Sequence, residues 1–69
     1  MLERINNIDY RYRIEDDNTL LAFNVITFEM TFLKGSNKDY IVKLLNNEEY
    51  NGTISEKNMN ILKNKKIII

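Results

Sequence analysis

The fold is decided by one stretch, Leu20-Leu-Ala-Phe-Asn-Val-Ile-Thr-Phe-Glu-Met-Thr-Phe-Leu33. Its many β-branched and aromatic residues predict two strands joined by a tight connection. In the second strand large apolar side chains alternate with polar ones, and an alternation of period two places them on one face of a sheet. We expect the helices that follow to cover this apolar face, which consists of Phe28, Met30 and Phe32.

The residues before this stretch predict one more strand. Residues 8–15 alternate between apolar or aromatic and charged side chains, which is the pattern of a half-buried strand with a charged outer face. Its buried side chains are expected to be Ile8, Tyr10, Tyr12 and Ile14. Residues 16–18 form a turn because Asp and Asn side chains bond to nearby backbone groups. The strands 8–15, 19–24 and 28–34 then form an antiparallel meander with the second strand in the centre.

The first helix is predicted after Gly35 and Ser36, which break the sheet. Ser36 is a favoured N-cap, and Asp39 three residues later is its capping-box partner. We expect this helix to run to about residue 46 and a polar loop to follow it at residues 46–52. Its apolar stripe consists of Tyr40, Ile41, Leu44 and Leu45.

The second helix is predicted at residues 56–65, with Thr53 and Ser55 as competing N-caps. Lysines gather at its C-terminal end, where the helix dipole favours cations. Residues 67–69 are three isoleucines, which predict a short C-terminal strand. The order of the elements indicates a single α+β domain over residues 1–69, winged-helix-like in its arrangement. The apolar positions of the second helix are Met59, Ile61 and Leu62.

The composition favours a binding protein over an enzyme. The 69 residues include neither Cys nor His, and ten basic side chains balance ten acidic ones. The chain thus lacks the commonest general base and the commonest metal ligands. Two pairs of adjacent carboxylates, Asp16-Asp17 and Glu48-Glu49, lie in turn-like, solvated stretches, where a carboxylate gains no catalytic character. We therefore expect no catalytic residue, no cofactor and no metal.

Composition also bears on partners and location. The charge balance argues against a protein that binds mainly to nucleic-acid phosphates. No apolar run approaches the ~20 residues of a membrane span, so no membrane partner is expected. The absence of Cys is consistent with a reducing compartment, and we expect the cytoplasm.

Two binding surfaces are compatible with this pattern. One is the edge of the third strand, whose free N–H and C=O groups would form a template for an extended peptide beside the second helix. The other is the basic C-terminal end, whose lysines would contact DNA phosphates in a winged helix. That helix has no Arg and exposes mainly Asn, so DNA binding is the alternative. In a third interpretation the apolar residues are simply core, and the exposed strand mediates dimerisation.

The sequence also resembles a known family. The residues that carry the resemblance are Tyr10-Arg-Tyr-Arg-Ile14, Leu20-Leu-Ala-Phe-Asn24, Thr27, an apolar strand ending at Leu33, Tyr40-Ile41, and Ser55 followed by Ile61-Leu-Lys-Asn-Lys-Lys-Ile-Ile68. Over about residues 8–69 the chain resembles the N-terminal precursor-peptide recognition domain (RiPP recognition element) of radical-SAM/SPASM peptide maturases. That winged-helix domain is similar to the peptide chaperone of pyrroloquinoline quinone biosynthesis. Its turn usually carries Gly after the threonine, where this chain has Phe28.

The resemblance implies a function and a site. In that family the domain binds the leader segment of a ribosomally synthesised precursor peptide, which adds to the third strand and packs against the last helix. The implied partners are a leader peptide and a radical-SAM maturase, either in the same chain or as a separate protein. The strand would supply backbone pairing, the helix an apolar pocket, and the lysines an attraction for acidic leader residues. The implied peptide-binding residues are Phe28, Met30, Thr31, Phe32, Leu33, Met59, Leu62, Lys63 and Lys66.

Overall fold

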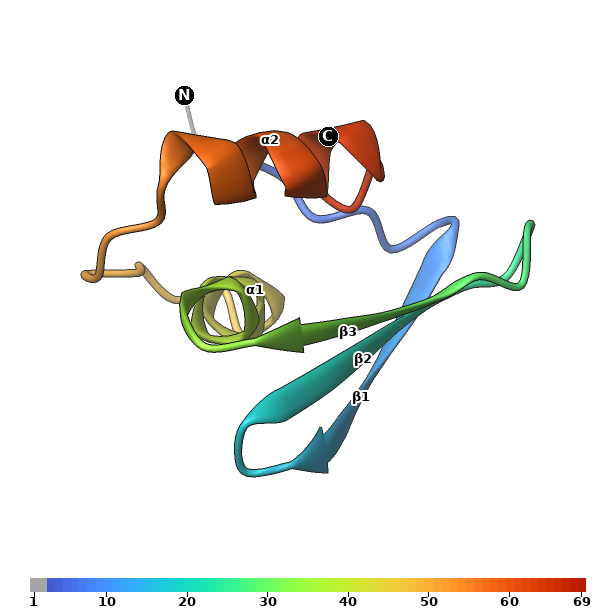
Figure 1. The fold of residues 1–69 in the computed structure, drawn as a ribbon, viewed down its shortest axis with the longest axis horizontal. Helices are drawn as coiled ribbons and strands as arrows, with labels where there is room; N and C mark the ends of the chain where they lie inside the picture. The colour runs from blue at the N-terminus through green and yellow to red at the C-terminus, as the bar shows by residue number, and fades with distance from the viewer. Residues whose placement is uncertain (1–2) are drawn as a thin grey trace.

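The computed structural model describes residues 3–69 as a three-stranded antiparallel sheet followed by two helices (Figure 1). The strand order is β1-β2-β3, so the predicted α+β class and the meander with its second strand in the centre are confirmed. The elements are β1 (Tyr10–Asp16), β2 (Thr19–Asn24), β3 (Met30–Lys34), α1 (Ser36–Leu45) and α2 (Glu56–Asn64).

Polar side chains close both hairpin loops. In the β1–β2 turn, the Asp16 carboxylate accepts a hydrogen bond of 2.8 Å from the backbone N–H of Asn18. In the β2–β3 loop, Oδ1 of Asn24 accepts bonds from the N–H groups of Ile26 and Thr27 at 2.8 and 3.0 Å. Asp16 and Asn24 therefore fix these turns through their own side chains, as the sequence predicts for the β1–β2 turn.

The β2–β3 loop ends at Phe28 in a left-handed backbone conformation, with φ of 64°. This conformation costs roughly 1–2 kcal/mol for a residue with a Cβ atom, whereas Gly adopts it freely. Phe28 stands where the resembled family usually has Gly. The loop thus has a backbone shape suited to Gly but carries a large aromatic side chain.

The helices cover the sheet face that carries Leu20, Ala22 and Leu33. The prediction that the helices cover Phe28, Met30 and Phe32 is therefore wrong. Alternation determines which residues share a face, but not which face is buried. The buried Leu20 lies opposite Leu33, and this pairing turns the other set of β3 side chains outward. The exposed fractions are 72 % for Phe28, 58 % for Met30 and 55 % for Phe32.

The predicted buried face of β1 is correct only near its start. Tyr10 is buried and Tyr12 half-buried, whereas Ile8 precedes the strand and Ile14 lies near its far end, and both are exposed. The beginning of β1 lies near the end of α2, where the Tyr10 hydroxyl donates to the Lys65 carbonyl (Figure 1). The β1–β2 turn meets α1 through a bond of 3.0 Å from Nζ of Lys38 to the Asp17 carbonyl. The core is centred instead on four fully buried side chains, Leu20, Ile41, Leu62 and Ile67.

The two helices begin differently. Gly35, with φ of 61°, occupies the N-cap position of α1 without a side-chain cap, so the predicted capping by Ser36 is wrong. Ser36 is instead the first helical residue. In α2 the hydroxyl of Ser55 accepts a hydrogen bond of 3.1 Å from the N–H of Asn58. Ser55 is therefore the N-cap of α2.

The end of α2 folds the C-terminal isoleucines back into the core. Lys66 has a left-handed backbone, with φ of 62°, its N–H donates to the Lys63 carbonyl, and the Ile67 N–H donates to the Leu62 carbonyl. This pair of bonds is a Schellman motif. The predicted C-terminal strand does not join the main sheet, because Ile68 pairs with Ile5 in an isolated antiparallel bridge.

The buried Asn6 holds the N-terminal segment against the end of α2. Its Nδ2 donates to the Lys66 carbonyl at 2.9 Å, and its Oδ1 accepts bonds of 3.0 Å from the N–H groups of Ile8 and Asp9. Close by, the Tyr10 hydroxyl donates to the Lys65 carbonyl at 2.6 Å. These bonds satisfy carbonyls that a helix end leaves without partners.

Candidate functional site

The outer edge of β3 is an open strand edge among the described residues, because β3 is last in the strand order. The N–H of Asn24 donates to the Glu29 carbonyl at 2.9 Å. In an antiparallel ladder the paired backbone groups alternate along the strand. Thr31 and Leu33, two and four residues after Glu29, therefore direct their N–H and C=O groups toward β2. The backbone groups of Met30, Phe32 and Lys34 point the other way, out of the sheet.

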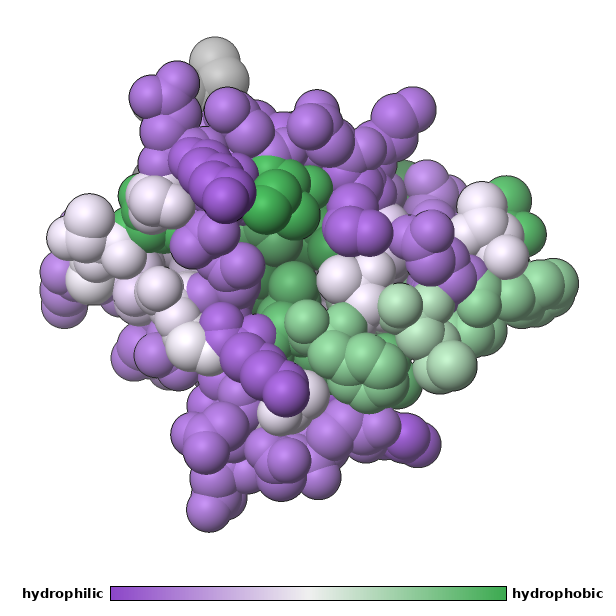
Figure 2. Space-filling model, viewed as in Figure 1, coloured by the Kyte–Doolittle hydropathy of each residue, from purple (hydrophilic) through white to green (hydrophobic). Residues whose placement is uncertain are grey.

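Helix α2 lies beside this open edge. Figure 2 shows hydrophobic residues in a hollow between α2 and β3 on the viewed face. Nζ of Lys65 lies 3.3 Å from a carboxylate oxygen of Glu29, which links the end of α2 to the residues before β3. Ile61 stands one helical turn before Lys65, on the same side of the helix, and is 38 % exposed. The hollow thus has an open strand edge on one side and, on the other, a side of α2 that carries Ile61 and leads to Lys65.

Thr31 supplies an unusual polar group near this edge. Its side chain is on the inner face, and its Oγ1 is buried with no hydrogen-bond partner. Buried polar atoms usually have a partner, because an unmade bond costs roughly 1–3 kcal/mol. The edge strand therefore holds an unsatisfied hydroxyl next to its unpaired backbone groups.

The structure divides the implied peptide-binding residues among several places. Leu33 and Leu62 are core residues, and Met59 is half-buried against the core. The side chains of Phe28, Met30 and Phe32 lie on the sheet face away from the helices, so only the backbone of β3 borders the hollow there. Of the implied residues, the structure brings Met30, Thr31 and Phe32 to the hollow through the backbone of β3. Met59 lies two residues before Ile61 and therefore on the other side of α2, packed against the core.

The lysines do not form one cluster at the hollow. Nζ of Lys63 lies 3.6 Å from a carboxylate oxygen of Glu3, which places it toward the N-terminal segment. Lys66 forms the left-handed end of α2. The peptide-binding residues implied by the resemblance did not include Ile61 and Lys65, the two side chains on the β3 side of α2 and its end. Their spacing of four residues was visible in the sequence, but the side of the helix that would face β3 was not.

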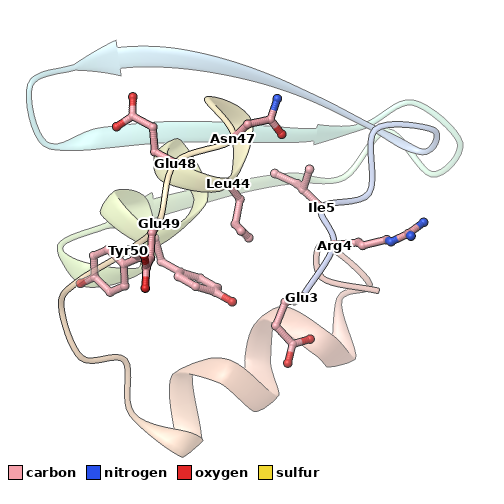
Figure 3. A pocket seen from close by; sticks show the side chains of 9 residues that line it. Glu3, Arg4, Ile5, Leu44, Asn47, Glu48, Glu49 and Tyr50 are labelled. Carbon is pink, nitrogen blue, oxygen red and sulfur yellow. The ribbon is translucent and has the colours of Figure 1, made fainter. Parts of the chain in front are cut away.

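A second hollow, of about 940 Å³, lies away from β3 (Figure 3). It is bordered by the N-terminal segment, the last turns of α1 and the loop that follows. The rings of Tyr40 and Tyr50 meet edge to face there, with centroids 5.5 Å apart. Burial, and to a lesser degree the charge of Glu3, raise the pKa of Tyr40. Its remaining lining residues are Arg4, Ile5, Leu44, Asn47, Glu48 and Glu49.

Two of the carboxylates around this second hollow are already paired with lysines. Glu3 pairs with Lys63, and Glu48 lies 2.8 Å from Nζ of Lys43. This bond raises the pKa of Lys43. Among residues 3–69 no three His, Cys, Asp or Glu side chains are grouped so that they could hold a metal ion, and no helix in this range is long and apolar enough to cross a membrane. We take the β3 edge as the candidate site because the backbone groups of Met30, Phe32 and Lys34 point out of the sheet there.

Comparisons with protein-family models, with curated proteins and with solved structures found no match for this chain. The resemblance to precursor-peptide recognition domains therefore rests on the residues quoted above.

Proposed function

We propose that this chain binds an extended peptide by strand addition to β3 and does not catalyse a reaction. The observation that carries this proposal is the open edge of β3, where the backbone groups of Met30, Phe32 and Lys34 point away from β2 on the side where Ile61 and the pair of Lys65 and Glu29 lie. Following the resemblance, the peptide is the leader segment of a ribosomally synthesised precursor. The chain would deliver it, in the cytoplasm, to a radical-SAM maturase.

The geometry of a sheet defines how such a peptide would lie. A new strand would run about 4.8 Å from β3 and use its backbone to pair with Met30 and Phe32. Alternate side chains of the peptide would point toward α2, where the partly exposed Ile61 offers apolar contact. Because backbone pairing does not depend on sequence, selectivity would come from these side-chain contacts and from Lys65 and Glu29 at one end.

The order of a three-stranded sheet followed by two helices supports the same proposal. The sheet and α2 supply the two elements that the resembled domains use for a leader peptide. DNA binding by the C-terminal lysines finds less support, because Lys63 and Lys65 are already engaged with Glu3 and Glu29.

The proposal is tested by an amide chemical-shift titration of the isotope-labelled chain. The ligands are the short peptide encoded beside it and, separately, duplex DNA. We expect the peptide alone to shift residues 29–34 and the β3-facing side of α2. Shifts centred on Lys57 and Lys66 with DNA alone would replace the proposal with the DNA-binding alternative.

Two variants at position 32 sharpen this test. Phe32→Pro removes the outward N–H and should weaken peptide binding at least tenfold, because an edge hydrogen bond is lost and the ring clashes with the added strand. Phe32→Thr removes the same side chain but keeps the N–H, and we expect it to change binding less than threefold. If the original chain, Phe32→Pro and Phe32→Thr bind the peptide equally, strand addition is refuted.

A further inference from the structure

The sheet face opposite the helices is apolar and uncovered among residues 3–69. We call it the outer sheet face and define it by Phe23, Phe28, Met30 and Phe32 together with Leu21, whose side chain is only 8 % exposed. Strand register places Phe23 between Arg11 and Met30, and Leu21 between Arg13 and Phe32. The ring of Phe28 lies 6.2 Å from that of Phe23, centroid to centroid. In Figure 2 a band of hydrophobic residues extends from the central hollow to the β2–β3 loop.

This face has the composition of an interaction surface. Phe28, Met30 and Phe32 are each more than half exposed, and aromatic and Met side chains with neighbouring Arg are enriched in protein interfaces. Phe28 is also held in a left-handed backbone conformation that Gly would adopt without strain. Strained residues that keep a large exposed side chain point to a functional use of that side chain.

Two arginines give the outer sheet face a charge. Nη1 of Arg11 donates to the carbonyls of Asn7 and Tyr10 at 2.8 and 2.9 Å, which holds its guanidinium in place. Within residues 3–69 Arg11 makes no ion pair, whereas Arg13 is bonded to Glu15 at 2.9 Å. A shallow hollow of about 330 Å³ is lined by the two arginines, Tyr12 and the outer-face residues Leu21 and Phe23. A carboxylate beside an apolar side chain would fit this hollow.

From these observations we propose that the outer sheet face docks an acidic amphipathic helix of a partner protein. The three strands span about 10 Å across the sheet, close to the diameter of one helix. In an antiparallel sheet the second face is commonly solvated and polar, whereas here it carries exposed Phe and Met side chains. A second copy of this chain fits less well, because the acidic side chain beside these arginines, Glu15, is already bonded to Arg13 and would not supply a free carboxylate to Arg11.

This docking surface is separate from the proposed peptide site. Strand addition uses the backbone of β3, whereas the outer sheet face uses side chains that point away from α2. The inference therefore does not depend on the proposed function, and each can fail without the other.

A displayed peptide library tests the inference. The probe is a phage library of 18-residue peptides that fixes apolar residues at helical spacing and randomises all other positions, selected on the whole chain. We expect Asp and Glu to be enriched next to the apolar stripe. The selected peptides should bind about tenfold more weakly to Arg11→Gln and to Phe32→Thr, whereas Lys57→Gln on α2 should leave binding unchanged.

Other outcomes would overturn the inference. The first is a selection that enriches no peptide, and the second is enrichment of Lys and Arg beside the apolar stripe. The third is binding of the selected peptides to Arg11→Gln and Phe32→Thr as tightly as to the original chain. Each of these results would contradict the docking of an acidic helix. A mass of two chains in sedimentation that Phe32→Thr abolishes would assign the face to a second copy. Cosedimentation with anionic phosphatidylserine vesicles that depends on Phe28 and Arg11 would assign it to a membrane. Proper folding of each variant is checked by its amide spectrum.

Discussion

Proline substitution at neighbouring positions of β3 measures directly which backbone groups face the open edge. In Thr31→Pro the lost N–H is one that bonds to β2, opposite the fully buried Ala22. The change removes a ladder bond and leaves a buried carbonyl without a partner, which costs about 1–3 kcal/mol, and ring clashes add to this. In Phe32→Pro the lost N–H faces outward, and Pro is tolerated at such positions of edge strands.

These costs are large for a chain of this size. A 69-residue domain has a stability of roughly 3–10 kcal/mol, so Thr31→Pro should remove a large part of it. Urea denaturation followed by circular dichroism is the assay, with a slope of about 1 kcal/mol per molar for a small protein. We expect the midpoint of Thr31→Pro to lie about 2 M below that of Phe32→Pro. Equal midpoints, or the reverse order, would refute the assignment of the open edge.

Four further substitutions test other parts of the structure. Leu62→Ala should lower the free energy of unfolding by about 2–5 kcal/mol in urea denaturation, because it empties the centre of the core, and an unchanged midpoint would contradict that placement. Asn6→Ala should cost about 1–3 kcal/mol in the same assay, since it leaves the Lys66 carbonyl without its side-chain donor, whereas the exposed Asn7→Ala should cost little. Lys66→Gly should raise stability by about 1 kcal/mol, because Gly relieves the left-handed strain at the end of α2, and a loss of stability would count against the Schellman motif. The backbone N–H of Asn18 donates to the Asp16 carboxylate and lowers the pKa of Asp16 below its ordinary 3.8, so the folded state favours the ionised form. The stability that this contributes is present above about pH 4 and is lost as the pH falls through the lower folded pKa. An acid titration of the stability of Asp16→Asn should lack this loss.

Local chemistry in the sequence was sufficient for the β1–β2 turn and the order of the elements, and it limited the N-cap of α2 to Thr53 or Ser55. Asp16 and Asn24 act through bonds to residues two or three positions away, and Ser55 does the same at the start of α2. Such features need no knowledge of distant contacts, and the structure confirms them. Ser36 was the exception, because Gly35 allows a left-handed backbone at the N-cap and moves the helix start by one residue.

The residues of β3 alone could not predict which set of its side chains faces the core. Both sets of side chains in this strand contain apolar residues, and β2 is apolar on both faces through Leu20, Leu21, Ala22 and Phe23. The choice between them is made by pairing between strands and by α1, which follows β3 after a single residue. For the same reason the sequence could not show that the backbone of Thr31 faces β2, or that Lys63 points to Glu3.

Position 32 separates the two proposed surfaces, because its N–H and its side chain point in different directions. Phe32→Pro changes both, whereas Phe32→Thr changes the side chain and keeps the outward N–H. If strand addition and helix docking both occur, the Thr variant should lose binding of selected helical peptides and keep binding of the extended peptide. The Pro variant should lose both. Loss of extended-peptide binding in Phe32→Thr as well would mean that the peptide lies on the outer sheet face, and the edge of β3 would no longer be the binding site.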